Sequence, residues 1–253
     1  MNARVVITGA SSGIGRALAV EYAQRGATLG LVARRGELLR ELAAMLKAPS
    51  VFYAVDVRDA SQLARSADDF RSRFGCPDVV IANAGVSVGT STERSEDRAV
   101  FQETLDVNVI GLFNTFAAFL PAMRSGGGTL VGIASVAGFR GLPGAGAYCA
   151  SKAAAIAYLE SLRVELRGTN ISVVTICPGY VDTPMTQGNP YPMPFIIPAE
   201  LAARRMARAI ARRERHVVIP WQMGIAGAVL KCLPRPFYDR MFALAPKKPR
   251  RDR

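Results

Sequence analysis

The sequence predicts an α/β fold, a doubly wound parallel sheet with helices on both faces. Short apolar runs rich in β-branched residues alternate with longer segments of helical periodicity along most of the 253 residues. The short runs are apolar almost throughout, which is typical of strands buried on both faces. Strand–helix alternation of this kind implies right-handed crossovers and therefore a parallel sheet.

Strands are expected at residues 3–8, 28–33, 51–55, 79–82, 128–134, 171–177 and 216–219. Helices are expected at residues 13–25, 36–46, 61–74, 97–124, 147–167 and 198–212. Two connections, residues 85–95 and 180–197, are longer than simple turns. Long connections at the carboxyl ends of parallel strands are where such sheets bind ligands. We therefore expect the functional site at this edge of the sheet.

The composition predicts one domain over residues 1–253. Half of the residues are hydrophobic and 21% are charged, which excludes a disordered or fibrous protein. Four cysteines lie far apart with no C-x-x-C pair, which indicates reduced thiols and neither a disulfide scaffold nor a zinc site. The only histidine is His216, so a metal site with two histidine ligands is excluded and no metal is expected.

The C-terminal fifth of the chain carries most of the excess positive charge. Residues 201–253 hold 14 basic and 3 acidic residues, and residues 221–253 form an extension that is also rich in apolar side chains. We expect this extension to pack partly on the body beside the substrate loop, and its basic end to bind anionic membranes weakly. Packing against another subunit is the alternative. Nucleic acid is not expected as a partner, because no known binding module is present.

A cytoplasmic protein, with peripheral contact to the membrane, is expected. The apolar run at residues 5–7 is too short for an export signal. The longest uncharged run near the C-terminus, residues 216–230, falls short of the roughly 20 apolar residues that span a bilayer.

The first strand leads into a glycine-rich loop and then directly into a helix. Glycines let the chain turn tightly and let the backbone approach a pyrophosphate, while the helix N-terminus offers free N–H groups. The pattern predicts a dinucleotide site. The residues expected to form it are Gly9, Ser11, Ser12, Gly13, Ile14 and Gly15.

The second strand ends without the acidic residue that usually binds the ribose 2′-hydroxyl. Arg34 and Arg35 stand there instead, and arginine binds a 2′-phosphate well. This favours NADP over NAD, although the two arginines could also be solvated residues at a helix start. Asp56 and Val57, after the third strand, are expected near the adenine.

Further motifs follow in order: Asn83-Ala84-Gly85, Asn108, Ser135, Tyr148-x-x-x-Lys152 and Pro178-Gly179. With the glycine-rich loop, they make the chain resemble the short-chain dehydrogenase/reductase family over roughly residues 3–220. The resemblance implies a Rossmann-type fold, a nicotinamide cofactor contacted by Asn83, Ala84 and Gly85, and a homodimer or homotetramer. The family's first asparagine in its N-N-A-G pattern is replaced by Ala82, on the strand side of the motif.

Tyr148 and Lys152 are four residues apart on a helical stretch, so their side chains share one face. A free tyrosine has a pKa of about 10, and a nearby ammonium would lower it. Tyr148 could then exchange a proton with a substrate oxygen while hydride moves to or from the nicotinamide. Ser135, at a strand end, is expected to orient that oxygen.

The resemblance assigns other roles. It implies that Lys152 also holds the nicotinamide ribose. It also implies that Asn108 is a catalytic residue, which holds a water linking the lysine to solvent and so completes a proton relay with Ser135, Tyr148 and Lys152. Pro178 and Gly179 would lie along the nicotinamide, and Thr183 would bind its carboxamide. Residues 180–200 would form the substrate loop, unless that loop only packs on the body.

The predicted function is therefore NADP-dependent interconversion of an alcohol and a carbonyl, on a small substrate with apolar character. Epimerisation or dehydration on the same tyrosine, and a cofactor-binding regulator without turnover, are the alternatives.

Overall fold

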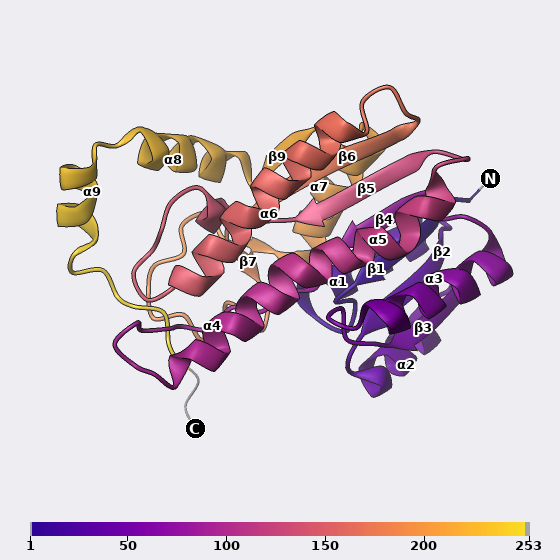
Figure 1. Ribbon diagram of the computed structural model, residues 1–253, viewed down its shortest axis with the longest axis horizontal. Coiled ribbons are helices and arrows are strands. Elements are labelled where there is room, and N and C mark those ends of the chain that lie inside the picture. Colours follow the sequence, from indigo (N-terminus) through magenta and orange to yellow (C-terminus); the bar gives the residue numbers. More distant parts are fainter. Residues whose placement is uncertain (1, 251–253) are drawn as a thin grey trace.

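The computed structural model describes residues 2–250 and confirms the predicted Rossmann-type α/β fold. A seven-stranded parallel sheet in the order β3-β2-β1-β4-β5-β6-β9 forms its centre, with helices on both faces (Figure 1). The order reverses direction after β1, so the chain runs outward along the sheet in both directions from its middle. The strands are β1 (Arg4–Thr8), β2 (Thr28–Ala33), β3 (Ser50–Ala54), β4 (Val79–Ala82), β5 (Gly128–Ile133), β6 (Ile171–Pro178) and β9 (His216–Ile219).

The helices divide between the two faces. On one face lie α1 (Gly13–Gln24), α2 (Gly36–Met45) and α7 (Ala199–Ala211), and on the other lie α3 (Ala60–Phe74), α5 (Gly111–Met123) and α6 (Gly146–Glu165). Within β1, Ile7 belongs to the first of these cores and Val6 to the second. Successive side chains of a strand point to opposite faces, so burial on both explains why the strands are apolar throughout.

The predicted helix over residues 97–124 is interrupted. It consists of α4 (Asp97–Leu105), a π-helical turn η1 (Asp106–Ile110) and α5, which continue as one segment. This segment, Asp97–Met123, is long and apolar enough to cross a bilayer by length and composition alone. Phe116, Phe119 and Met123 are fully buried against the sheet, so much of that apolar character serves the core.

Two short strands, β7 (Val181–Asp182) and β8 (Ile197–Pro198), pair with each other and join the ends of the predicted substrate loop. A short 3₁₀ turn, η2 (Val136–Gly138), follows β5.

The C-terminal extension is helical, which the sequence had not indicated. It forms α8 (Trp221–Cys232) and α9 (Arg235–Phe242), which lie at one end of the molecule outside the sheet (Figure 1). Arg140 holds the two helices, because its Nη1 donates to the carbonyls of Leu230 (2.5 Å) and Leu233 (2.7 Å). The Arg140 guanidinium also lies 4.1 Å from the centroid of the Tyr238 ring. The chain then returns to the body at residues 247–250, where Lys248 Nζ donates to Asn189 Oδ1 of the substrate loop (3.0 Å).

Candidate active site

The carboxyl ends of the central strands open into a cleft of about 350 Å³ that brings most of the predicted site residues together. Gly15 and Asn108 are the two that do not line it. Gly15 lies behind the glycine-rich loop, where a Cβ would collide with the Gly9 carbonyl. The predicted residues that line the cleft are Gly9, Ser11, Ser12, Gly13, Ile14, Arg34, Arg35, Asp56, Val57, Asn83, Ala84, Gly85, Ser135, Tyr148, Lys152, Pro178, Gly179 and Thr183.

The glycine-rich loop is fixed by backbone geometry and by one asparagine. Gly9 (φ 68°) and Gly13 (φ 55°) have left-handed backbone conformations, which other residues adopt at a cost. Asn83 Nδ2 donates to the Thr8 carbonyl (2.9 Å), and Thr8 Oγ1 accepts from the N–H groups of Asn83 and Ala84 (3.1 Å each). The ends of β1 and β4 are thereby joined beneath the start of α1.

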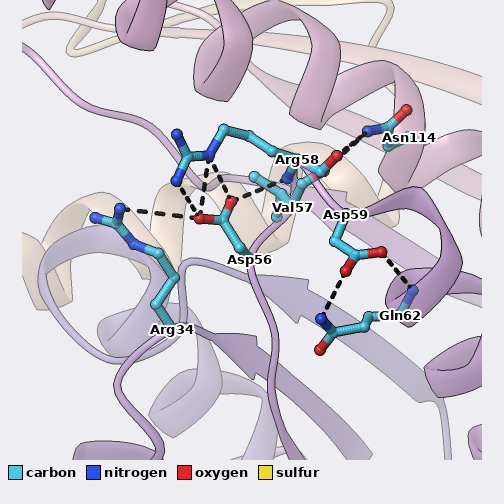
Figure 2. Close-up of polar contacts among 7 residues, drawn as sticks. All are labelled: Arg34, Asp56, Val57, Arg58, Asp59, Gln62 and Asn114. Carbon is cyan, nitrogen blue, oxygen red and sulfur yellow. Dashed lines mark hydrogen bonds and ion pairs between the residues drawn. The ribbon is translucent and has the colours of Figure 1, made fainter.

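Two arginines lie where the adenosine end of a dinucleotide would bind. Arg35 Nη2 donates to Ser12 Oγ (2.7 Å) and Ser11 Oγ (3.0 Å), so this guanidinium covers the glycine-rich loop. Arg34 extends toward Asp56, with its Nη1 4.0 Å from Asp56 Oδ2 (Figure 2). The Arg34 side chain keeps 54% of its surface exposed and is therefore accessible to a ligand.

Sequence reasoning missed Arg58, which holds the Asp56 carboxylate. Its Nη2 donates to Asp56 Oδ2 (2.7 Å) and its backbone N–H to Oδ1 (3.0 Å) (Figure 2). These hydrogen bonds lower the pKa of Asp56 and outweigh the opposing effect of its burial. The Asp-x-Arg spacing was the available signal, since a carboxylate two residues before an arginine can pair with it locally.

The loop after β3 is held by two other residues shown in Figure 2. Asn114 Nδ2 donates to the Val57 carbonyl (3.1 Å), which ties the loop to α5. Asp59 caps α3, because its Oδ1 accepts from the backbone N–H of Gln62 (2.9 Å). That hydrogen bond is the main reason why the pKa of Asp59 falls to about 2. Asp56 and Val57 thus sit on a well-braced loop.

Lys152 is buried beneath Tyr148 at the inner end of the cleft. Its Nζ donates to the Ile133 carbonyl at the end of β5 (2.8 Å) and lies 5.8 Å from the centroid of the Tyr148 ring. Burial lowers the pKa of Lys152 to about 8. The two side chains share one face of α6, as their spacing predicted.

The pKa of Tyr148 differs from the sequence-based expectation. Burial raises it to about 12, and the interaction with the Ser135 hydroxyl offsets only part of this rise. The ammonium of Lys152 faces the ring and bonds a backbone carbonyl, and the pKa of Tyr148 is raised in spite of its presence. In the protein without cofactor, Tyr148 is therefore a neutral phenol that can donate a proton. Ser135 Oγ accepts from the N–H of Ala137 (3.1 Å) at the start of η2.

Asn108 lies in the π-helical turn and joins the segment after β4 to α6. Its Oδ1 accepts from the Val86 N–H (2.8 Å), and its Nδ2 donates to the Val86 carbonyl (3.0 Å) and to Ser151 Oγ (2.9 Å). Ser151 Oγ in turn donates to the Tyr148 carbonyl (2.7 Å). The Asn108 side chain thus connects the segment after β4 to the helix that carries Tyr148 and Lys152.

The far side of the cleft is formed by the segment after β6. Gly179 packs against Met223 of α8, and Thr183 lies against Gly13 of the glycine-rich loop. Thr183 is buried, and its N–H donates to Thr186 Oγ1 (3.1 Å). In the substrate loop, the rings of Tyr180 and Tyr191 pack with centroids 6.4 Å apart. Tyr180 directly follows Gly179, which lines the cleft, so this pair of rings belongs to the segment that leaves the cleft.

The cleft fits a nicotinamide dinucleotide. A side chain at Gly15 would displace the Gly9 carbonyl, so this glycine lets the start of α1 pack closely behind the loop. The start of α1 has no side-chain cap, which leaves its first N–H groups for an anion. Within residues 2–250, no group of three or more His, Cys, Asp and Glu side chains is arranged to hold a metal ion.

Comparison with known proteins establishes the class of the chain. Residues 3–191 match the family model described as short chain dehydrogenase. The chain belongs to the short-chain dehydrogenase/reductase family, and it is therefore an oxidoreductase of that family with a nucleotide-binding fold.

Two relatives illustrate the range of similarity. An uncharacterized oxidoreductase of Myxococcus xanthus is 39% identical over 92% of this chain and 94% of its own length. An 11-beta-hydroxysteroid dehydrogenase A of Sesamum indicum is 36% identical over 85% of this chain and 68% of its own length.

Solved structures with either cofactor resemble this fold. A short chain dehydrogenase/reductase from Burkholderia phymatum in complex with NAD superposes with a TM-score of 0.83 at 25% identity, covering 99% of this chain and 98% of its own. A short chain dehydrogenase from Burkholderia cenocepacia in complex with NADP gives a TM-score of 0.83 at 26% identity, covering 97% of this chain and 98% of its own.

Proposed function

We propose that the protein interconverts an alcohol and a carbonyl by hydride transfer with NADP(H), using Ser135, Tyr148 and Lys152 as catalytic residues and Asn108 as their support. The observation that carries this proposal is the convergence of Ser135, Tyr148 and Lys152 on the cleft that the glycine-rich loop also lines. When bound, the cofactor supplies or accepts the hydride.

Each side chain has a task that fits its surroundings. Tyr148, a neutral phenol with a pKa raised to about 12 by burial, donates its proton to a substrate oxygen in the reductive direction. The Ser135 hydroxyl orients that oxygen. The buried ammonium of Lys152 stabilises the tyrosinate that remains and holds the nicotinamide ribose.

The preference for NADP over NAD is supported by charge. Arg34 is accessible at the end of β2, and Arg35 lies over Ser11 and Ser12. No carboxylate of β2 stands where a ribose 2′-hydroxyl would need one. Asp56 is engaged by Arg58, so its charge is partly neutralised beside Arg34.

The remaining features of the proposal concern the whole chain. Residues 1–253 act as one dinucleotide-binding oxidoreductase domain, with residues 180–200 as the substrate loop and 221–253 as the C-terminal extension. Three exposed apolar side chains of the loop, Met185, Phe195 and Ile196, favour a substrate with apolar character. We place the protein in the cytoplasm, as a homodimer or homotetramer, with weak peripheral contact to an anionic membrane surface.

A panel of apolar ketones and aldehydes tests this proposal. We expect NADPH oxidation by the wild type and a 10²–10⁴-fold lower kcat, roughly, for Tyr148→Phe. NADPH affinity, measured by fluorescence, should be the same for both, because only a hydroxyl is removed. A near-wild-type kcat for Tyr148→Phe would remove this tyrosine from the mechanism. Cofactor binding without net turnover on any substrate would favour epimerisation, dehydration or a regulatory role.

A further inference from the structure

The outer surface of α8 and α9 carries a set of exposed apolar side chains. On α8, Trp221 (65% exposed), Ile225 (57%) and Val229 (61%) are four residues apart and therefore share one face. On and after α9, Phe237 (67%), Met241 (54%) and Leu244 (95%) repeat a similar spacing. We call these six residues the apolar ridge: Trp221, Ile225, Val229, Phe237, Met241 and Leu244.

The two helices that carry the ridge are packed firmly on the body of the protein. The opposite side of α8 is packed, because Met223 contacts Gly179 and Gly227 contacts the Phe139 ring. Tyr238 of α9 is buried under Arg140, and its hydroxyl donates to the Gly141 carbonyl. Both helices are thus fixed to the body by one side and present the ridge on another. Exposed apolar clusters on a well-packed element usually mark an interaction surface.

Cations lie between and after the ridge residues along the chain. Lys231, Arg235, Arg240 and Lys247 are all exposed, and Asp239 is the one acidic residue of the described part of the extension, residues 221–250. This surface therefore combines apolar side chains with a strong excess of positive charge.

Charge complementarity decides between two occupants. A second copy bound symmetrically through the ridge would bring the same cations of the two subunits together, with a single carboxylate from residues 221–250 of each to offset them. An anionic lipid surface supplies the opposite charge and accepts apolar side chains at the level of the headgroups.

We propose that the apolar ridge and its flanking cations bind the surface of an anionic membrane, with Trp221 at the level of the lipid headgroups. Tryptophan is favoured at that level because its ring is apolar while its N–H remains hydrogen-bonded. Arg140, which holds both helices, belongs to the segment between Ser135 and Tyr148. A membrane bound to these helices therefore lies beside the substrate side of the site. An apolar substrate dissolved in the lipid is then close to the cleft.

The chain carries its own probe, since Trp221 is its only tryptophan. Its emission is recorded with the full-length wild type while vesicles of phosphatidylglycerol and phosphatidylcholine, or of phosphatidylcholine alone, are added. We expect a blue shift and protection from a soluble quencher with the anionic vesicles at low salt. High salt should weaken binding, because each cation near an anionic surface changes partitioning by about fivefold in dilute salt.

Paired variants locate the binding surface. Ile225→Asp/Val229→Asp should abolish the blue shift, while Met45→Asp, at an equally exposed apolar residue on α2, should leave it unchanged. Lys231→Glu/Arg235→Glu should weaken binding by at least tenfold, and Arg204→Glu/Arg208→Glu on the exposed basic face of α7 should not.

Two results would overturn the proposal. One is an unchanged Trp221 emission with anionic vesicles at low salt. The other is a blue shift that follows protein concentration without lipid, which would make the ridge a contact between copies of the chain. None of these measurements needs turnover, and no ridge residue lines the cleft. Failure of membrane binding and failure of the proposed catalysis can therefore be distinguished.

Discussion

Arg250 and Asp97 form a two-point ion pair that joins the C-terminal segment to the start of α4. Arg250 Nε donates to Asp97 Oδ2 and Nη2 to Oδ1, both at 2.8 Å. Asp97 Oδ2 also accepts from the N–H of Ser91 (2.7 Å), and the N–H of Gly89 donates to the Pro249 carbonyl (2.8 Å). The long connection after β4 is therefore held between α4 and residues 249–250.

Arg250→Ala should loosen this connection. We expect faster amide hydrogen exchange at Gly89 and Ser91 and a lower thermal midpoint, because both amides depend on the arrangement that Arg250 fixes. Lys247→Ala, at an exposed lysine nearby, is the matched control and should leave both quantities unchanged. Unaltered exchange in Arg250→Ala would show that the segment is held without the ion pair.

The same pair predicts a pH dependence. Hydrogen bonds from Arg250 lower the pKa of Asp97 below its value in the unfolded chain, about 3.9. A carboxylate with a lowered folded-state pKa stabilises the fold above the unfolded-state pKa, and this contribution is lost as the pH falls through the folded-state pKa. The difference in stability between wild type and Arg250→Ala should be constant from pH 7 to 5 and shrink below about pH 4. Urea unfolding at each pH measures it.

Asn108→Ala should destabilise the protein because the backbone N–H and carbonyl of Val86 both lose their hydrogen bonds to the Asn108 side chain. Asn108 is 1% exposed, and buried polar groups left unpaired cost about 1–3 kcal/mol each. Ser151→Ala removes only one of the three hydrogen bonds of Asn108, so its loss should be smaller. Urea unfolding of both variants at pH 7 compares them. A larger loss for Ser151→Ala would mean that the bond to α6, and not the two bonds to Val86, is the important one.

Sequence patterns predicted the sheet and the cleft well for a physical reason. Strands buried on both faces must be apolar throughout, and a dinucleotide loop must be glycine-rich, so both leave local marks in the chain. The strands at residues 79–82 and 216–219 were located without error. Residues predicted from separate motifs lie together in the cleft because the carboxyl ends of all the parallel strands are at the same edge of the sheet.

Features that depend on distant contacts were not predictable in this way. The helices of the C-terminal extension were not expected, although Pro234 and Pro236 lie at the start of α9, where proline is tolerated. The pairing of Arg250 with Asp97 joins residues 153 positions apart, and no local pattern marks it. The raised pKa of Tyr148 depends on how deeply it is buried, whereas the sequence only showed that an ammonium would be near.

Lys152→Met should reveal the cost of burying an ammonium. The folded protein releases the Lys152 proton near pH 8, whereas the unfolded chain holds it until about 10.4. The unfolded state therefore binds more protons in this range, and the stability of the wild type relative to Lys152→Met should rise with pH. The full rise is about 3 kcal/mol, from a pKa difference of roughly two and a half units. Urea unfolding between pH 7 and 10.5 measures it, with Lys47→Met as a surface control. A pH-independent difference would mean that Lys152 is not strongly desolvated.

Arg34→Asp should narrow or reverse a preference for NADPH over NADH. Hydrogen bonds to charged groups contribute about 1.5–3 kcal/mol, which corresponds to roughly one to two decades in affinity. Loss of the guanidinium should therefore weaken the binding of NADPH by this factor and leave the binding of NADH nearly unchanged. Fluorescence titration of both cofactors measures the two affinities. The new carboxylate would also repel Asp56, so Arg34→Ser separates loss of the cation from gain of a charge. Arg71→Asp, at a similarly exposed arginine on α3, controls for the change in net charge. If the wild type binds both cofactors equally, and Arg34→Ser leaves that ratio unchanged, Arg34 does not contact a 2′-phosphate.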